Sequence, residues 1–203
     1  MEREKCLDKR MYDISKYAEI LEIILISFGI FLVPIILPQI LNIVFGNTSA
    51  IASNSQYVVG AIVNASLIIA GVNVKGWKKI VGLVTLPSMS AILSGLVFKS
   101  ATIFVVYMIP AIWVGNFTII YLYRKLFVEK KLNYLFSSII GIIVKATIIF
   151  TGFNLLTAIN IIPKENPVAA VLYTVMGANQ LITATLGSIL AFTIVKAVYR
   201  AKK

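Results

Sequence analysis

The basic residues of this chain lie almost entirely on alternate connections between long apolar stretches. Of the nineteen lysines and arginines, sixteen fall in four segments that a six-span threading places on one side of a membrane. The sixteen are Arg3, Lys5, Lys9, Arg10, Lys16, Lys75, Lys78, Lys79, Arg124, Lys125, Lys130, Lys131, Lys196, Arg200, Lys202 and Lys203. The opposite side receives only Lys99 and Lys164. Because cytoplasmic connections are enriched in Lys and Arg, this pattern predicts a membrane protein with both termini in the cytoplasm.

The apolar stretches have the length that a membrane requires, since a bilayer core of about 30 Å needs roughly 20 residues of helix. The expected spans are Ile20–Ile43, Val58–Val74, Ile80–Phe98, Ala101–Tyr123, Leu135–Ile159 and Val168–Tyr199. A composition of 59% apolar and 13% charged residues agrees with this class. The sequence therefore predicts an all-α integral membrane protein with six transmembrane helices in one bundle.

Three segments follow from this threading. Residues 1–19 are expected to form a cytoplasmic N-terminal tail, residues 20–199 the six-helix transmembrane domain, and residues 200–203 a short cytoplasmic C-terminal tail. The net charge of +11 is accounted for by the topology and by attraction to anionic inner-leaflet lipid, so nucleic acid is not an expected partner. Richness in Ile, Lys and Asn resembles an AT-rich bacterium, which predicts the plasma membrane of a bacterial cell.

Several kinds of catalytic chemistry lack their residues in this chain. Cys6 is the single cysteine and histidine is absent, so zinc sites, disulfides and cysteine-ligated clusters have no ligands. Neither a G-x-S-x-G nucleophile motif nor a phosphate-binding loop occurs. We therefore expect no enzyme activity, no ATP hydrolysis, no cofactor and no bound metal.

Lys145 lies near the middle of the fifth expected span. Ten residues separate it from the inner end of that span and fourteen from the outer end, or roughly 15 and 20 Å at about 1.5 Å per residue. Snorkelling over such distances is unfavourable. Within the expected spans, Glu22 is the only acidic residue, and it lies near the inner end of the first. The lysine must therefore be neutral, bind carbonyls and water, or bind an anionic ligand.

Uncharged polar side chains fall in the outer half of the same bundle. They are Asn64, Tyr107, Thr151, Asn154, Asn179 and Gln180. Amides in hydrocarbon must be hydrogen-bonded, so these residues are expected to face the bundle interior or a wet cavity. Two interpretations follow: they either join helices to one another or line a binding pocket around Lys145. The predicted pocket residues are Lys145, Asn64, Asn154, Gln180, Asn179 and Tyr107.

Small residues and prolines mark places where helices approach or bend. The pairs Ala61 with Ala65, Ala91 with Gly95 and Gly187 with Ala191 repeat at four residues, as in close helix contacts. Pro34 and Pro38 are expected to break the end of the first span, and Pro87 and Pro110 interrupt the third and fourth. Broken helices often border a binding cavity.

Four motifs resemble the substrate-binding S components of energy-coupling factor transporters. They are Gly60-Ala-Ile-Val-Asn-Ala-Ser-Leu, Leu86-Pro-Ser-Met-Ser-Ala-Ile-Leu-Ser-Gly95, Met108-Ile-Pro-Ala-Ile-Trp-Val-Gly-Asn116 and Asn179-Gln-Leu-Ile-Thr-Ala-Thr-Leu-Gly187. The resemblance covers roughly residues 58 to 195. It implies capture of a vitamin-like molecule from outside, with a membrane coupling subunit and two cytoplasmic ATPases as partners.

The resemblance also implies that Gly46 to Tyr57 forms an outer lid. A small-xxx-small docking motif is expected in the first span of such proteins, whereas here it occurs as Ala61 and Ala65 in the second. Missing histidines and intramembrane carboxylates argue against a metal substrate and favour a small organic molecule with a carboxylate or phosphate. Two alternatives stay open: a small secondary carrier or channel, and a membrane scaffold that binds no ligand.

Overall fold

The computed structural model describes residues 2–46, 49 and 54–201, and these ranges contain helices and turns but no strand. In chain order the helices are α1 (Glu2–Phe45), α3 (Ser55–Asn73), α4 (Trp77–Ser94), the 3-10 turn η1 (Lys99–Ala101), α5 (Thr102–Leu122), the π-helix η2 (Tyr123–Glu129), α6 (Tyr134–Ala158), α7 (Pro167–Met176) and α8 (Ala178–Ala201). The all-α prediction is confirmed. Half of the expected outer lid, residues 47, 48 and 50–53, lies outside the described residues, and its last residues, Ser55 to Tyr57, begin α3.

Five stretches of the described chain are helical, long and apolar enough to cross a membrane. They are Glu19–Phe45, Ser55–Asn73, Lys99–Glu129, Tyr134–Ala158 and Pro167–Ala197. The third expected span corresponds to α4, which has 18 residues and begins with Trp77, Lys78 and Lys79. At about 1.5 Å per residue, α4 is about 27 Å long, slightly less than the hydrocarbon core. The chain is thus a multi-pass membrane protein with five or six candidate spans.

Two expected spans end or bend where glycine permits it. The third ends at Ser94, not at Phe98, because Gly95 adopts a left-handed conformation (φ 63°) and its N–H donates to the carbonyls of Ala91 and Ile92. The sixth is not one helix, since the chain turns at Gly177 between α7 and α8. A Cβ at Gly177 would lie 2.8 Å from the Tyr173 carbonyl oxygen, so the turn requires glycine.

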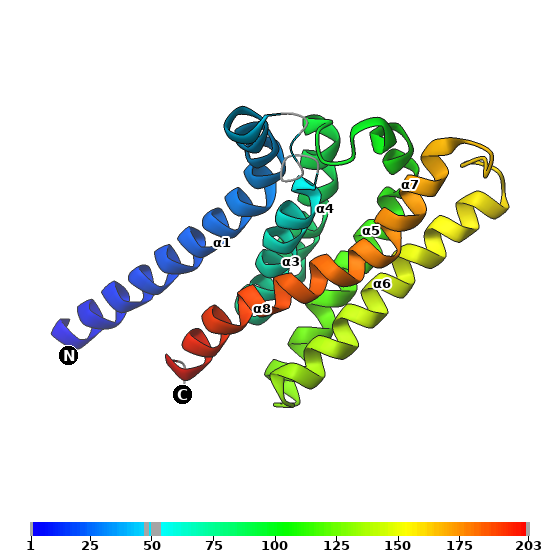
Figure 1. The fold of residues 1–203 in the computed structure, drawn as a ribbon. Coiled ribbons are helices and arrows are strands. Elements are labelled where there is room, and N and C mark those ends of the chain that lie inside the picture. The colour runs from blue at the N-terminus through cyan, green and yellow to red at the C-terminus, as the bar shows by residue number, and fades with distance from the viewer. Residues whose placement is uncertain (1, 47–48, 50–53, 202–203) are drawn as a thin grey trace.

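The first helix differs from the expected tail followed by a broken span. α1 runs without interruption from Glu2 to Phe45, so the tail is helical and continuous with the first span. Pro34 and Pro38 lie inside the helix and do not end it, although its last turns bend away from the direction of the earlier ones (Figure 1). Prolines inside a helix bend it by removing backbone hydrogen bonds.

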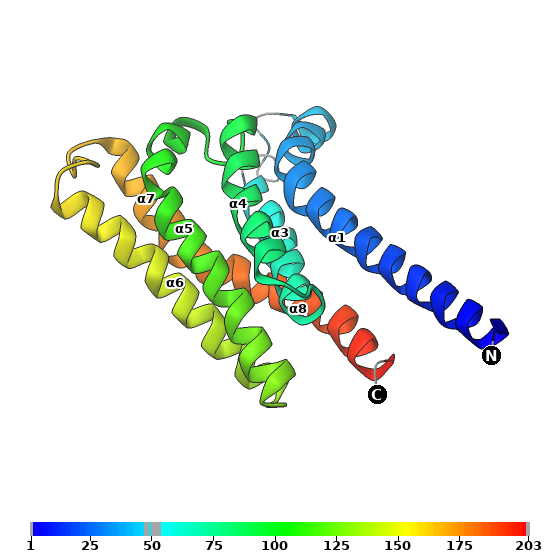
Figure 2. The same cartoon turned by 180° about the vertical axis from the view of Figure 1, so that it is seen from behind.

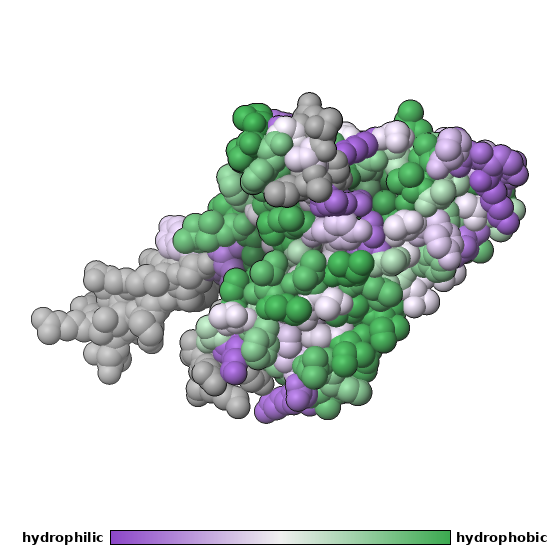
Figure 3. Space-filling view, viewed as in Figure 1, coloured by the Kyte–Doolittle hydropathy of each residue, from purple (hydrophilic) through white to green (hydrophobic). Residues whose placement is uncertain are grey.

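The central element of the bundle is α3. It packs against α1, α4, α5, η2 and α8, while α5 packs against α6 and α1 contacts only α3 and α4 among the described elements. The start of α1 and the end of α8 lie at the same end of the bundle, and the first turns of α1 extend away from it (Figures 1 and 2). Apolar residues cover much of the face in Figure 3, and hydrophilic residues gather at the α6–α7 connection.

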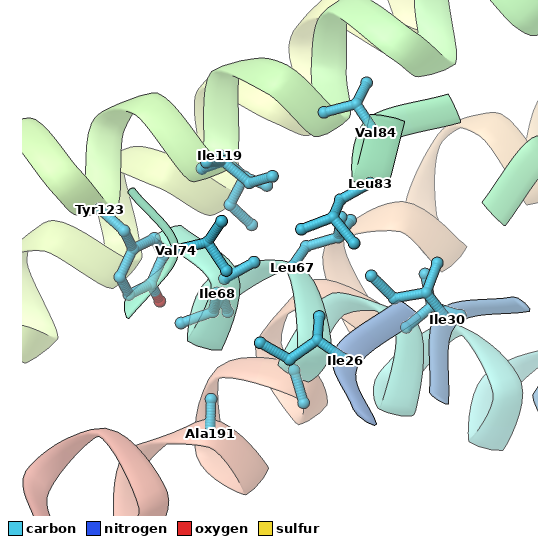
Figure 4. Packing of buried hydrophobic residues seen from close by; sticks show 14 of the residues in the cluster. Ile26, Ile30, Leu67, Ile68, Val74, Leu83, Val84, Ile119, Tyr123 and Ala191 are labelled. Carbon is cyan, nitrogen blue, oxygen red and sulfur yellow. The ribbon is translucent and has the colours of Figure 1, made fainter. Parts of the chain in front are cut away.

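An apolar core surrounds the lower part of α3. Leu67 and Ile68 are completely buried, as are Ile119 and Tyr123 from the α5–η2 segment, and they pack together in Figure 4. The Arg124 guanidinium donates to the carbonyl oxygens of Gly71 and Val74, which lie at the end of α3 and past it. These contacts satisfy carbonyls that a helix end leaves unpaired and attach η2 to α3.

Candidate functional site

Glycines bring α3 and α8 into direct backbone contact. A Cβ at Gly187 of α8 would lie 2.5 Å from the Asn64 Cβ, and one at Gly60 of α3 would lie 2.7 Å from the Thr183 Cγ2. The Gly187 position also lies against Ala61 and Ala65, both buried. The small-residue pair of the second expected span therefore forms an internal helix contact. Because the two backbones approach so closely, Asn64 and Thr183 lie side by side.

Next to this contact, a cavity of about 90 Å³ lies between the helices and shares Gly60, Asn64 and Thr183 with it. Its walls come from α1, α3, α4, α5, α6, α7 and α8, with Val97 and Phe98 from the α4–α5 connection. The polar lining residues are Gln56, Asn64, Ser88, Lys145, Asn179, Gln180 and Thr183. One water needs roughly 10–15 Å³ by this kind of measure, so the cavity accommodates several waters or a small molecule.

Lys145 is the only basic or acidic residue on the described cavity wall. It is 3% exposed, and 11 residues of α6 precede it while 13 follow it, which is about 17 and 20 Å from the two helix ends. Its Nζ donates to the Asn64 Oδ1 at 2.5 Å. The described ion pairs, Lys79 with Glu19 and Lys125 with Glu129, lie elsewhere. The Lys145 amine thus contacts a neutral amide within the described part of the chain.

Asn64 connects this lysine to α8. Its Nδ2 donates to the Gly60 carbonyl oxygen at 2.8 Å and to the Thr183 Oγ1 at 3.4 Å. Since Nδ2 is held by a carbonyl, which only accepts, the Oδ1 is fixed toward Lys145. The polar network therefore joins α3, α6 and α8 in the middle of the bundle.

The remaining amides lie just after the turn at Gly177. The Tyr57 hydroxyl of α3 donates to the Asn179 Oδ1 at 2.9 Å. The Gln180 Nε2 donates to the Val175 carbonyl oxygen at 3.2 Å, back across the turn between α7 and α8. A break in a transmembrane helix frees backbone groups, and here a side chain of the next turn satisfies one of them.

The α4 wall is held by a tryptophan. The Trp113 Nε1 of α5 donates to the Ser88 Oγ at 2.7 Å, and the Ser88 hydroxyl donates to the Thr85 carbonyl oxygen. Pro87 is buried beside Ser88 and lines the same wall, as does Pro34 of α1. Two of the four prolines expected to mark helix breaks therefore border the cavity.

The structure brings four of the six predicted pocket residues together: Lys145, Asn64, Asn179 and Gln180 all line the cavity. Asn154 does not, because it is exposed on another face of α6 and donates to the Phe150 carbonyl oxygen. It borders a separate hollow of about 390 Å³ between α6 and α7 with Lys164 and Tyr173. Tyr107 is 52% exposed on α5, and Thr151 is exposed as well. These three face away from Lys145.

Sequence reasoning did not single out Gln56, Thr183 and Ser88 as part of the cavity wall. The sequence spacing of Thr183 and Gln56 could have indicated that they line the cavity. Thr183 follows Asn179 by four residues, and Gln56 precedes Asn64 by eight, so each lies on the same helix face as a residue that was predicted. Ser88 has no comparable signal, since its position depends on how α4 rotates against α5.

Fold and cavity together define the class: a multi-pass helical membrane protein with a mostly apolar cavity between its helices, into which a lysine and a few polar side chains are gathered. Comparison of the chain with protein-family models, with curated proteins and with solved structures gave no match.

Proposed function

We propose that this protein captures a small organic nutrient from outside the cell and holds it in the cavity around Lys145 for uptake. The observation that carries this proposal is the convergence of Lys145, Asn64, Asn179 and Gln180 on one cavity. If these residues served only to join helices, their hydrogen bonds would fill the space between them. Instead, they border a cavity of about 90 Å³, and concave sites with a few convergent polar groups are typical of ligand binding.

The proposal includes an orientation with both termini in the cytoplasm. The α3–α4 connection, which carries Lys75, and the segment after η2, which carries Lys130 and Lys131, lie at the same end of the bundle as the start of α1 and the end of α8. This grouping of basic residues supports a cytoplasmic location for that end. The cavity then lies toward the outer half, where Tyr57 and Phe98 are near the helix ends that face outside.

The energy for uptake must come from elsewhere, because the chain has no phosphate-binding loop. The resemblance to S components of energy-coupling factor transporters leads us to propose a separate membrane coupling subunit and cytoplasmic ATPases as partners. Ala61 and Ala65 are packed against Gly187 and do not offer a docking motif on the surface. Docking must therefore use another face of the bundle, and the exposed apolar side of α1, which includes Leu21, Leu25 and Phe28, is the one we propose.

A second candidate is a secondary carrier, and the turn at Gly177 favours it. Carriers often bind substrate at discontinuous helices near the membrane midplane, and α7 and α8 form such a helix beside the cavity. A carrier needs no ATPase, so the two candidates differ in what the purified protein does alone.

The test is purification from the native membrane in mild detergent, followed by reconstitution. The S-component proposal predicts that the chain co-purifies with a second membrane protein and with ATPases, and that liposomes holding the chain alone do not accumulate substrate. Recovery of a lone species that transports in energy-free liposomes would replace this proposal with the carrier. Recovery of a lone species that neither transports nor binds a small molecule would support the scaffold.

A further inference from the structure

The size of the cavity limits what it can hold. An enclosed apolar cavity of about 150 Å³ binds benzene, so a cavity of about 90 Å³ favours a ligand of no more than about six non-hydrogen atoms. A ligand with about that number of non-hydrogen atoms fits the cavity as it stands. Nucleotides and large ring cofactors exceed this size.

The lysine on the cavity wall determines which charge the ligand should carry. Lys145 has an ammonium with three N–H donors, and Asn64 is its one acceptor within the described part of the chain. No described lining residue is acidic. An anionic group on the ligand would therefore gain charge-assisted hydrogen bonds, whereas a cationic group would lie near a like charge without a counter-ion.

The amides beside Lys145 show what else the ligand can bond. Both ends of the Asn64 amide are occupied, by Lys145 and by Gly60. Gln180 uses its Nε2 on the Val175 carbonyl, so its Oε1 is the group that can accept from a ligand. Asn179 accepts from Tyr57 through its Oδ1, so its Nδ2 is the group that can donate. The Gln180 Oε1 and the Asn179 Nδ2 are thus a neutral acceptor and a neutral donor available to a ligand.

We propose that the cavity binds a compact organic monoanion that carries a carboxylate, a neutral hydroxyl or amide group and no cationic group. The carboxylate lies at Lys145, and the neutral group exchanges hydrogen bonds with Asn179 and Gln180. This inference rests on the proposed function of substrate capture and names the chemical class of its substrate. It separates such a ligand from amino acids, whose ammonium group would lie in a cavity with a lysine and without a described acidic residue.

Four probes on one three-carbon skeleton test this class: lactate, propionate, alanine and lactamide. They differ in charge and in the group at the second carbon but hardly in size. Isothermal titration of the full chain in detergent should give lactate the lowest Kd. Alanine and lactamide should bind at least about tenfold more weakly, because alanine adds a cationic ammonium group and lactamide has no anionic carboxylate. Propionate should bind more weakly than lactate by about threefold or more, because it has no hydroxyl.

The controls are Lys145→Met and Asn154→Leu. Lys145→Met should abolish lactate binding, and Asn154→Leu, outside the cavity, should leave it unchanged. Equal or tighter binding of alanine, lactamide or propionate would overturn the proposed class, as would unaltered lactate binding by Lys145→Met or no binding of any probe. The proposed function fails separately, through the absence of coupling partners and of any bound small molecule. Tight, Lys145-dependent binding of alanine would contradict the proposed substrate class but would still support substrate capture.

Discussion

Gly187 on α8 lies so close to Asn64 on α3 that a Cβ at position 187 would stand 2.5 Å from the Asn64 Cβ and 2.7 Å from the Ala61 carbonyl oxygen. This contact fixes the distance between the two helices that carry most of the cavity's polar groups. The packing of small residues and the chemistry of the cavity therefore depend on one another.

We expect Gly187→Ala to destabilise the protein by about 1–3 kcal/mol, because two backbones must move apart to admit the methyl group. Gly82→Ala is the matched control: Gly82 also lies within a helix, but a Cβ there would meet no atom within 4 Å. The control should be neutral or stabilising by up to about 1 kcal/mol through helix propensity. Thermal unfolding in detergent measures both, and equal effects would contradict the close approach of α3 and α8.

Asn64→Leu should cost about 1–3 kcal/mol, since it removes the acceptor of the buried Lys145 ammonium and the donor to Thr183. Asn154→Leu makes the same chemical change on an exposed face of α6, where the effect should stay within about 0.5 kcal/mol. Chemical unfolding of the two variants in one detergent compares them directly. A larger loss for Asn154→Leu would mean that the polar network is assigned to the wrong face of α6.

Tyr57→Phe removes the hydroxyl that donates to Asn179 and should reduce stability by about 0.5–1.5 kcal/mol. It should also weaken binding of lactate, because the Asn179 amide would no longer be held in one orientation. Tyr107→Phe is the control, since Tyr107 is largely exposed outside the cavity. Titration calorimetry and unfolding together measure the two effects, and similar behaviour of both variants would remove Tyr57 from the account.

Single cysteines in a Cys6→Ser background test the orientation. Glu165→Cys, in the α6–α7 connection, should react with an impermeant thiol reagent added to intact cells, and Lys130→Cys, after η2, should react only after the cells are broken. Both native residues are exposed, so accessibility within the protein does not distinguish them. The reverse labelling pattern would invert the proposed topology.

The depth of polar residues in the bundle could be predicted from the sequence, but their direction around each helix was harder to predict. Lys145 and Asn154 are nine residues apart on α6, and at about 100° per residue they point to opposite faces. Apolar residues surround the whole of this helix, so hydropathy did not show which face is inside. Lys145 itself was predictable because a mid-membrane lysine cannot face lipid.

The helix ends, too, could be predicted only in part from the sequence. The left-handed conformation at Gly95 and the turn at Gly177 arise from local backbone geometry, and each shortened or divided a span that hydropathy alone had extended. The continuity of the N-terminal residues with the first span in one helix was not predicted, because their mixed acidic and basic residues resemble a solvated tail. The α3–α8 contact was visible in the small residues, whereas its two partner helices were identified only by the structure.

The measurement that tests the central claim most directly is the small-molecule content of the purified protein with and without the Lys145 charge. Lys145→Met removes a lysine that insertion scales penalise by about 2.5–3.5 kcal/mol, and leaves the Asn64 Oδ1 unpaired at a cost of about 1–3 kcal/mol. These effects nearly offset, so the variant should fold with stability within about 2 kcal/mol of the original. Mass spectrometry of denatured extracts should find a small organic anion in the original protein and none in Lys145→Met. The same anion in equal amount in both proteins, or no enriched anion in either, would contradict an anion-binding role for Lys145.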